Sequence, residues 1–207
     1  MPTVPRKKNK SRGAAKGASF EREISVKLSL WVSQMKLKDV FWRSAMSGGR
    51  STVLAKGGDG SASAHAGDLV ANRPEGYALT STFFVECKAY SKFSMEDIFI
   101  HGSRGLREII VEKPIREANQ WDLIPLIIIK PDRKKIMVMT DEMGVDLFSY
   151  GTHFPQDLCK ARAHFPECDL TVYAFSDVVV GLDWEPIERE IRRRQRKAKG
   201  KRSAPTV

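Results

Sequence analysis

The sequence has no long hydrophobic run, which excludes a membrane-spanning helix. The longest apolar stretch, within residues 123–129, contains a proline and is far shorter than the roughly 20 residues needed to cross a bilayer. No charged segment followed by an apolar one opens the chain, so we expect no secretory leader. There are three cysteines in 207 residues. A disulfide framework is therefore not expected, and the chain suits a reducing cytoplasm.

Acidic residues are absent or scarce at both ends of the chain. Residues 1–16 carry six Lys and Arg and no acid, and residues 186–207 carry nine against two acids. Residues 17–185 hold 20 basic and 23 acidic side chains, so the net charge of +10 comes entirely from the two ends. Basic arms around a near-neutral core favour a polyanion such as nucleic acid as partner, although solubilising tails have the same composition.

Composition also divides the chain into one domain with extensions. We expect a disordered basic arm over residues 1–16, because this segment has too little apolar content to fold alone. A single domain is expected over residues 17–185, with its core at 17–145 and a C-terminal elaboration at 146–185. Residues 186–207 are expected to form a basic C-terminal helix or tail. The hydrophobic fraction of 42% is sufficient for one packed core.

One stretch, residues 67–90, combines charged side chains with the pattern of strands. Residues 83–89 alternate as a strand does, so Glu86 and Lys88 share the face opposite an apolar one. Asp68 opens a second apolar run, and antiparallel pairing of the two runs would bring its carboxylate close to Glu86. Two carboxylates and a lysine on neighbouring strands can hold a hard cation and present a positive charge to a phosphate. Without that context, an acid and a lysine two residues apart are an ordinary surface ion pair.

The segment before this stretch predicts an amphipathic helix with Ser19 as its N-cap. Glu21 shares a helical face with the apolar residues Ile24 and Leu28, whereas Glu23 lies on a more polar face. Glu21 is therefore the better candidate to point into a site. An acid in the first turn also interacts favourably with the helix dipole, which is the competing explanation.

The rest of the chain predicts alternating strands and helices. We expect a strand at 39–46, a long Gly/Ser-rich loop at 47–66, helical structure over 95–120 with interruptions at its glycines and proline, a fully buried strand at 123–129 that forms a hairpin with 134–140, an edge strand at 171–180, and a helix that starts at Trp184.

Three motifs, in this order, resemble those of the PD-(D/E)xK nuclease superfamily, and in particular the Holliday junction resolvases of the archaeal type and their phage relatives. They are residues 17–23 on the first helix, residues 67–71, and Glu86 to Lys88. Gly67 stands where the superfamily name has proline, and the loop before Asp68 is longer than expected. The resemblance implies an α/β fold with a restriction-endonuclease-like core, which consists of a helix, a three-stranded antiparallel meander, a helix and a strand. A mixed central sheet and extra C-terminal elements complete this expectation.

The same resemblance implies the roles of individual residues. Glu21, Asp68, Glu86 and Lys88 would be catalytic, with Lys88 orienting or helping to deprotonate the attacking water. Mg²⁺, for which Mn²⁺ can substitute, would be held by Asp68, Glu86, the carbonyl of Cys87 and Glu21. The expected DNA contacts are Arg43, Ser44, Ser47, Arg50, Arg193 and Arg194.

The function implied is that of a metal-dependent, structure-selective DNA endonuclease, in first place a Holliday junction resolvase. Such an enzyme would leave 5′-phosphate and 3′-hydroxyl ends on branched or duplex DNA, in the host cytoplasm if it is encoded by a phage. Two paired cuts imply a homodimer. Two alternatives stay open: a nicking enzyme or exonuclease of the same superfamily, and a non-catalytic DNA-binding or packaging protein on a nuclease-like fold.

A separate group of potential metal ligands lies near the C-terminus. His153, Cys159, His164 and Cys168 could in principle hold zinc tetrahedrally. Their spacing matches no familiar zinc finger, so we expect ordinary loop residues here.

Overall fold

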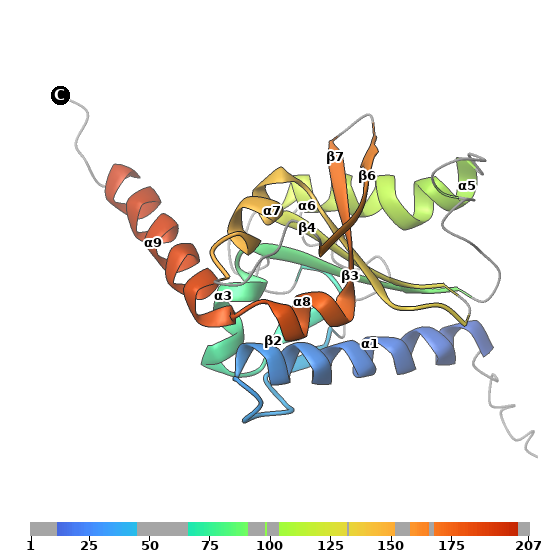
Figure 1. The fold of residues 1–207 in the computed structure, drawn as a ribbon, viewed down its shortest axis with the longest axis horizontal. Coiled ribbons are helices and arrows are strands. Elements are labelled where there is room, and N and C mark those ends of the chain that lie inside the picture. Colours follow the sequence, from blue (N-terminus) through green and yellow to red (C-terminus); the bar gives the residue numbers. More distant parts are fainter. Residues whose placement is uncertain are drawn as a thin grey trace, which may run out of the picture.

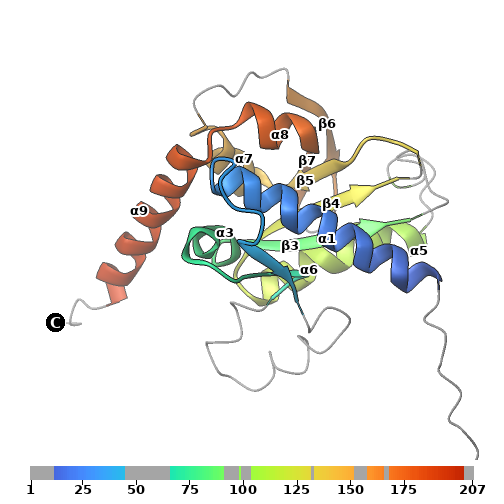
Figure 2. The same ribbon diagram turned by 90° about the horizontal axis from the view of Figure 1, so that it is seen from below.

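A computed structural model of the chain describes residues 12–44, 66–90, 98, 104–131, 133–151, 158–165 and 168–202. Within these ranges a five-stranded mixed sheet lies between two layers of helices (Figure 1). Helices α1 and α8 cover one face of the sheet, and the segment from α5 to α6 covers the other. Figure 2 shows the same layers from below, with α9 extending away from them.

The elements have the following bounds. The helical segments are α1 (Arg12–Val32), η2 (Pro74–Gly76), α3 (Tyr77–Thr80), α5 (Arg104–Arg107), the π-helical turns η3 (Glu108–Glu112), α6 (Lys113–Gln120), α7 (Glu142–Phe148), α8 (Phe175–Gly181) and α9 (Trp184–Arg202). The strands are β1 (Phe41–Arg43), β2 (Leu69–Ala71), β3 (Phe83–Ala89), β4 (Ile124–Lys130), β5 (Met137–Thr140), β6 (Cys159–His164) and β7 (Asp169–Ala174).

The five-stranded sheet has the order β3-β4-β5-β7-β6, so β3 and β6 are its edges. Strand β3 runs parallel to β4, and the other neighbours are antiparallel. A parallel neighbour requires a long crossover connection, which the helical segment from α5 to α6 supplies. Strand β4 is apolar from Ile124 to Ile129 because it is buried on both faces. Leu126 and Ile128 pack in the cluster with α1, and Ile127 and Ile129 pack in the cluster with α6.

A short ribbon of β1 and β2 lies against the outer edge of β3. The two strands pair antiparallel from Phe41 with Ala71 to Arg43 with Leu69. The backbone N–H of Asp68 donates to the carbonyl of Val85 at 2.8 Å, which connects the ribbon to β3. The order of helix, three strands, helix and strand is thereby confirmed, and the fold is of the restriction-endonuclease-like class. The expected three-stranded meander is divided, because β1 and β2 form a two-stranded sheet beside β3.

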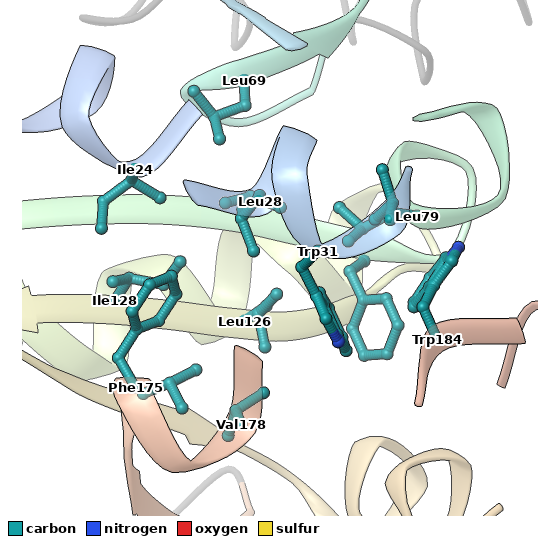
Figure 3. Packing of buried hydrophobic residues seen from close by; sticks show 14 of the residues in the cluster. Ile24, Leu28, Trp31, Leu69, Leu79, Leu126, Ile128, Phe175, Val178 and Trp184 are labelled. Atoms are coloured by element: carbon teal, nitrogen blue, oxygen red, sulfur yellow. The ribbon is translucent and has the colours of Figure 1, made fainter. Parts of the chain in front are cut away.

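The C-terminal elements dock on α1 through aromatic side chains (Figure 3). The Trp31 indole N–H donates to the carbonyl of Leu182 at 2.8 Å, and its ring lies 4.9 Å from that of Trp184. Ile187 and Ile191 are buried one and two turns into α9. Although α1 and α9 are the longest helices, no helix in the described part of the chain is long and apolar enough to cross a membrane.

Two local predictions from the sequence were wrong. Helix α1 begins at Arg12 and not after Ser19, because the intervening Ala- and Lys-containing residues are compatible with a helix. Residues 12–16, which we assigned to the basic arm, are therefore helical. Strand β7 ends at Ala174 and is not an edge, since it lies between β5 and β6. The segment 175–181 is helix α8. Its residues Phe175 and Val178 are three positions apart and both face the core, as the helical period requires. The valines of this segment, which are typical of strands, hid that period in the sequence.

We expect replacement of Ile128 by Ala to lower the free energy of unfolding by about 2–5 kcal/mol, because it leaves a cavity in the centre of the sheet. Urea denaturation followed by circular dichroism measures this loss. The control is Val180→Ala on α8, whose side chain is 85% exposed, and it should change stability by less than about 0.5 kcal/mol. Equal effects of the two substitutions would contradict the assignment of the core.

Candidate active site

Asp68 is held against the edge of β3 by two hydrogen bonds. Its N–H donates to the carbonyl of Val85, and its carboxylate Oδ2 accepts the N–H of Cys87, each at 2.8 Å. A strand residue turns its N–H and its C=O to the same edge. The carbonyl of Cys87 therefore points toward the edge at which Asp68 lies. A carboxylate and a backbone carbonyl are thus gathered at one point of the strand.

Gly67 makes this close approach of the two segments possible. Its φ of +88° lies in the left-handed region, and a Cβ there would lie 2.6 Å from the carbonyl oxygen of Val85. Proline, with φ fixed near −65°, cannot adopt this conformation. The departure from the superfamily name at this position therefore has a structural reason.

Glu86 and Lys88 occupy the face of β3 that is turned toward α6. On that face Phe84 packs with Ala118 of α6, and Glu86 and Lys88 follow at two-residue intervals along the strand. The two side chains form an ion pair. Glu86 is only 8% exposed and Lys88 is partly buried, so this pair is largely shielded from solvent, unlike the surface pair of the competing interpretation.

Glu21 reaches the site from the opposite layer. It lies on the buried side of α1 with Ile24 and is 8% exposed. Its carboxylate forms an ion pair with Arg43 at the end of β1. Glu23, by contrast, pairs with Lys27 and Lys130 at 2.8 and 2.9 Å. Of these two acids, Glu21 is the one whose charge acts on Asp68, and its role in a site stays a prediction.

Burial and mutual repulsion disfavour ionisation of the carboxylates. Burial, followed by the charges of Glu86 and Glu21, raises the pKa of Asp68 to about 8, although the hydrogen bond from Cys87 acts in the opposite direction. Burial also raises the pKa of Glu86, against the effect of Lys88. Burial alone would lower the pKa of Lys88, but the charge of Glu86 and its hydrogen bond outweigh that effect and raise it. Lys88 is therefore positively charged.

This donor set fits a hard divalent cation. Asp68, Glu86 and the Cys87 carbonyl offer oxygen atoms, which Mg²⁺ prefers, and a bound cation would favour the ionised form of the two carboxylates, whose pKa values burial raises. In the described residues, no group of three or more His, Cys, Asp or Glu side chains is gathered closely enough to hold a metal by side chains alone. A cation would accordingly need the backbone carbonyl and water, while Glu21 is engaged by Arg43.

The predicted DNA contacts are placed unevenly. Ser44 is 2% exposed, and its backbone N–H donates to the carbonyl of Asp68 at 2.7 Å. Its side chain is thus not at the surface, where we expected a DNA contact. Arg43 pairs with Glu21. On α9, Arg193 and Arg194 both pair with Glu190. The last two predicted contacts, Ser47 and Arg50, lie outside the described residues.

The potential zinc ligands are spread along the β6–β7 hairpin. Cys159 and His164 stand at opposite ends of β6, five residues apart, or roughly 16 Å along an extended strand. The Nδ1 atom of His164 lies 2.6 Å from the carboxylate of Asp169. Cys159 and His164 therefore cannot bind one ion together. His153 lies outside the described residues.

Sequence reasoning missed two charged residues near the site. Glu117 on α6 acts to raise the pKa of Glu86, and Lys113, 3.7 Å from Glu117, acts to lower it. Neither belongs to a motif. The helix that carries them is amphipathic, but its rotation relative to β3 depends on the packing of Ala118 against Phe84.

The fold together with Asp68, Glu86 and Lys88 defines a nuclease of the PD-(D/E)xK type. A family model described as phage putative PDDEXK endonuclease matches residues 12–171, and the chain belongs to this family. The match begins at the first residue of α1 and covers every element that contributes to the site. A search of curated proteins and a search of solved structures gave no match.

We expect Gly67→Ala to destabilise the protein by at least about 1–2 kcal/mol, which is the cost of a left-handed conformation for an L residue. The added Cβ would also collide with the carbonyl of Val85, which increases the loss. Chemical denaturation measures this. The matched control is Gly105→Ala in α5, where an added Cβ meets nothing within 4 Å. That change should be neutral or stabilising by up to about 1 kcal/mol. A neutral result at position 67 would refute the close approach.

The raised pKa of Asp68 predicts a pH-dependent stability. The unfolded chain releases this proton near pH 3.8 and the folded protein near pH 8. Between these values the unfolded state binds fewer protons, so stability falls as pH rises. Asp68→Asn, measured in EDTA, should therefore raise the melting temperature relative to the unsubstituted protein more at pH 7.5 than at pH 4.5. A difference that does not change with pH would contradict the burial of this carboxyl group.

Proposed function

We propose that the protein is a metal-dependent DNA endonuclease that resolves four-way junctions. The observation that carries the proposal is the buried group of Asp68, Glu86 and Lys88 at the edge of β3, with Glu21 beside it. Membership of an endonuclease family supports the class of reaction. The preference for a branched substrate rests on the resemblance of the motifs at 17–23, 67–71 and 86–88 to those of the resolvases.

Two carboxylates would hold the metal. Asp68 and Glu86, with the carbonyl of Cys87 and water, provide oxygen ligands for Mg²⁺ or Mn²⁺. When bound, the cation would lower the pKa of a coordinated water and stabilise negative charge on the phosphate. Glu21 would complete the site through water or after release from Arg43.

Lys88 supplies positive charge to the reacting phosphate. Its ammonium group is paired with Glu86, and its raised pKa keeps it protonated. A protonated lysine can donate hydrogen bonds to the attacking water and to a phosphate oxygen, and it can neutralise charge that develops there. Orientation and charge neutralisation are therefore its better-supported roles, ahead of proton abstraction.

DNA would reach the site from the side of the β1–β2 ribbon. Arg43 lies at the end of β1, and its guanidinium already contacts Glu21. A phosphate could replace that carboxylate as its partner, since Arg binds carboxylates and phosphates with the same geometry. Resolution of a junction requires two opposed cuts, so the active form would be a homodimer.

We expect purified protein to cut an end-labelled synthetic four-way junction at symmetric positions in Mg²⁺, and to prefer it over a replication fork, linear duplex and single strand. Asp68→Asn, Glu86→Gln and Lys88→Ala should each reduce the cleavage rate by at least about a hundredfold, while junction binding in a gel-shift assay persists. Glu23→Gln is the control, because Glu23 is a helix α1 carboxylate paired away from the site.

The other outcomes distinguish the alternatives. Single nicks in duplex, or stepwise loss of nucleotides from an end, would replace the resolvase proposal by a nicking enzyme or an exonuclease with the same site. Binding without cleavage in either Mg²⁺ or Mn²⁺, unchanged by the three substitutions, would leave a DNA-binding protein on a nuclease-like fold. A monomer on the junction in sedimentation velocity would contradict the paired-cut mechanism.

A further inference from the structure

Helix α9 consists of a docked part and a projecting part. Trp184, Ile187 and Ile191 are buried against the body of the protein. The side-chain amide of Gln195 donates to the hydroxyl of Ser81 on the body at 2.9 Å. Beyond this point, residues 196–199 are all exposed, and Figure 1 shows the helix leaving the domain.

Charge is distributed unevenly along this helix. In the docked part each arginine has an acidic partner: Arg189 pairs with Glu185 at 2.9 Å, and Arg192 pairs with Glu188 at 2.6 Å. Glu190, which is 5% exposed, accepts from two further arginines, Arg193 and Arg194. These ion pairs neutralise the first turns of the helix.

Arg194 consequently has a structural role, whereas Arg193 pairs with Glu190 within the same helix. Arg194 also pairs with Asp146 of α7, and its guanidinium lies 5.8 Å from the centre of the Tyr150 ring. Glu190, Asp146 and Tyr150 together fix the angle at which α9 leaves the body. Our prediction from the sequence assigned DNA binding to these two arginines, whereas the contacts favour residues further along the helix.

The projecting part is rich in basic side chains. No acidic residue follows Glu190 in the sequence. Among the described residues, neither Arg196 nor Lys197 has an acidic partner within ion-pair distance, and both line a shallow groove with Arg189, Arg192 and Arg193. Like charges three and four positions apart destabilise a helix. A bound polyanion would remove that repulsion.

We propose that the projecting part of α9, and Arg196 and Lys197 in particular, binds the phosphate backbone of DNA outside the catalytic site. The proposal rests on the proposed nuclease function, and it assigns to α9 the task of holding the arms of the substrate. A membrane surface is the less suitable polyanion, because interfacial helices need an apolar face and the only apolar residue after Ile191 in the helix is Ala198.

The salt dependence of DNA binding tests this proposal. Each phosphate contact contributes roughly −0.9 to the slope of log K against log salt. Arg196→Ala/Lys197→Ala should reduce the magnitude of the slope by roughly 1.8 and weaken binding roughly 30-fold at 0.15 M salt. Fluorescence anisotropy with a labelled four-way junction in EDTA measures both.

Lys36→Ala/Lys38→Ala is the matched control, because it removes the same charge from exposed residues between α1 and β1. An unchanged slope in the α9 variant, or an equal change in the control, would overturn the proposal. So would binding of anionic phosphatidylserine vesicles that is lost in the α9 variant while DNA binding is unaffected. The binding assay does not require cleavage, so the two proposals are tested separately. The α9 variant can leave DNA binding unchanged while Glu86→Gln abolishes cleavage, which would overturn only the α9 proposal. The opposite pair of results would overturn only the proposed nuclease function.

Discussion

The candidate site depends on the pairing of residue 68 with the edge of β3. The N–H of Asp68 donates to Val85, and the N–H of Cys87 donates to the Asp68 carboxylate, both at 2.8 Å. Backbone contacts thus fix the position of the Asp68 carboxylate more firmly than a side-chain rotamer alone would. It requires Gly67, since any side chain there would meet the Val85 carbonyl. The same contact attaches the β1–β2 ribbon, and with it Arg43, to the central sheet.

The site lies at a strand edge because only there can both helical layers contribute to it. Glu21 comes from α1 on one face of the sheet, and Glu86 and Lys88 lie on the face turned toward α6. Burying several carboxylates near one lysine is costly, because ionised groups lose hydration and repel one another. The raised pKa values of Asp68 and Glu86 express that cost. A divalent cation, which needs such a site, would offset it.

Helix α9 shows how the same residue types serve two purposes in one element. Arginines next to an acid four residues earlier, such as Arg189 and Arg192, neutralise the docked turns. After Glu190 the helix has no further acidic residue, so its basic side chains form an exposed cationic surface at Arg196 and Lys197. The family match ends at residue 171, before α9 begins. Helix α9 therefore lies outside the segment that the family model describes.

The sequence by itself determined the local chemistry of this protein. The alternation of residues 83–89 predicted the face shared by Glu86 and Lys88, and the spacing to Ile24 distinguished Glu21 from Glu23, because both follow from the periods of a strand and a helix. Only the tertiary structure decided which charges meet. The pairing of Arg43 with Glu21, the approach of Glu117 to Glu86, and the bonding of Arg194 to Asp146 join residues from different elements. Such contacts depend on how helices and strands pack against one another, and the spacing of residues within one helix or strand does not predict that packing.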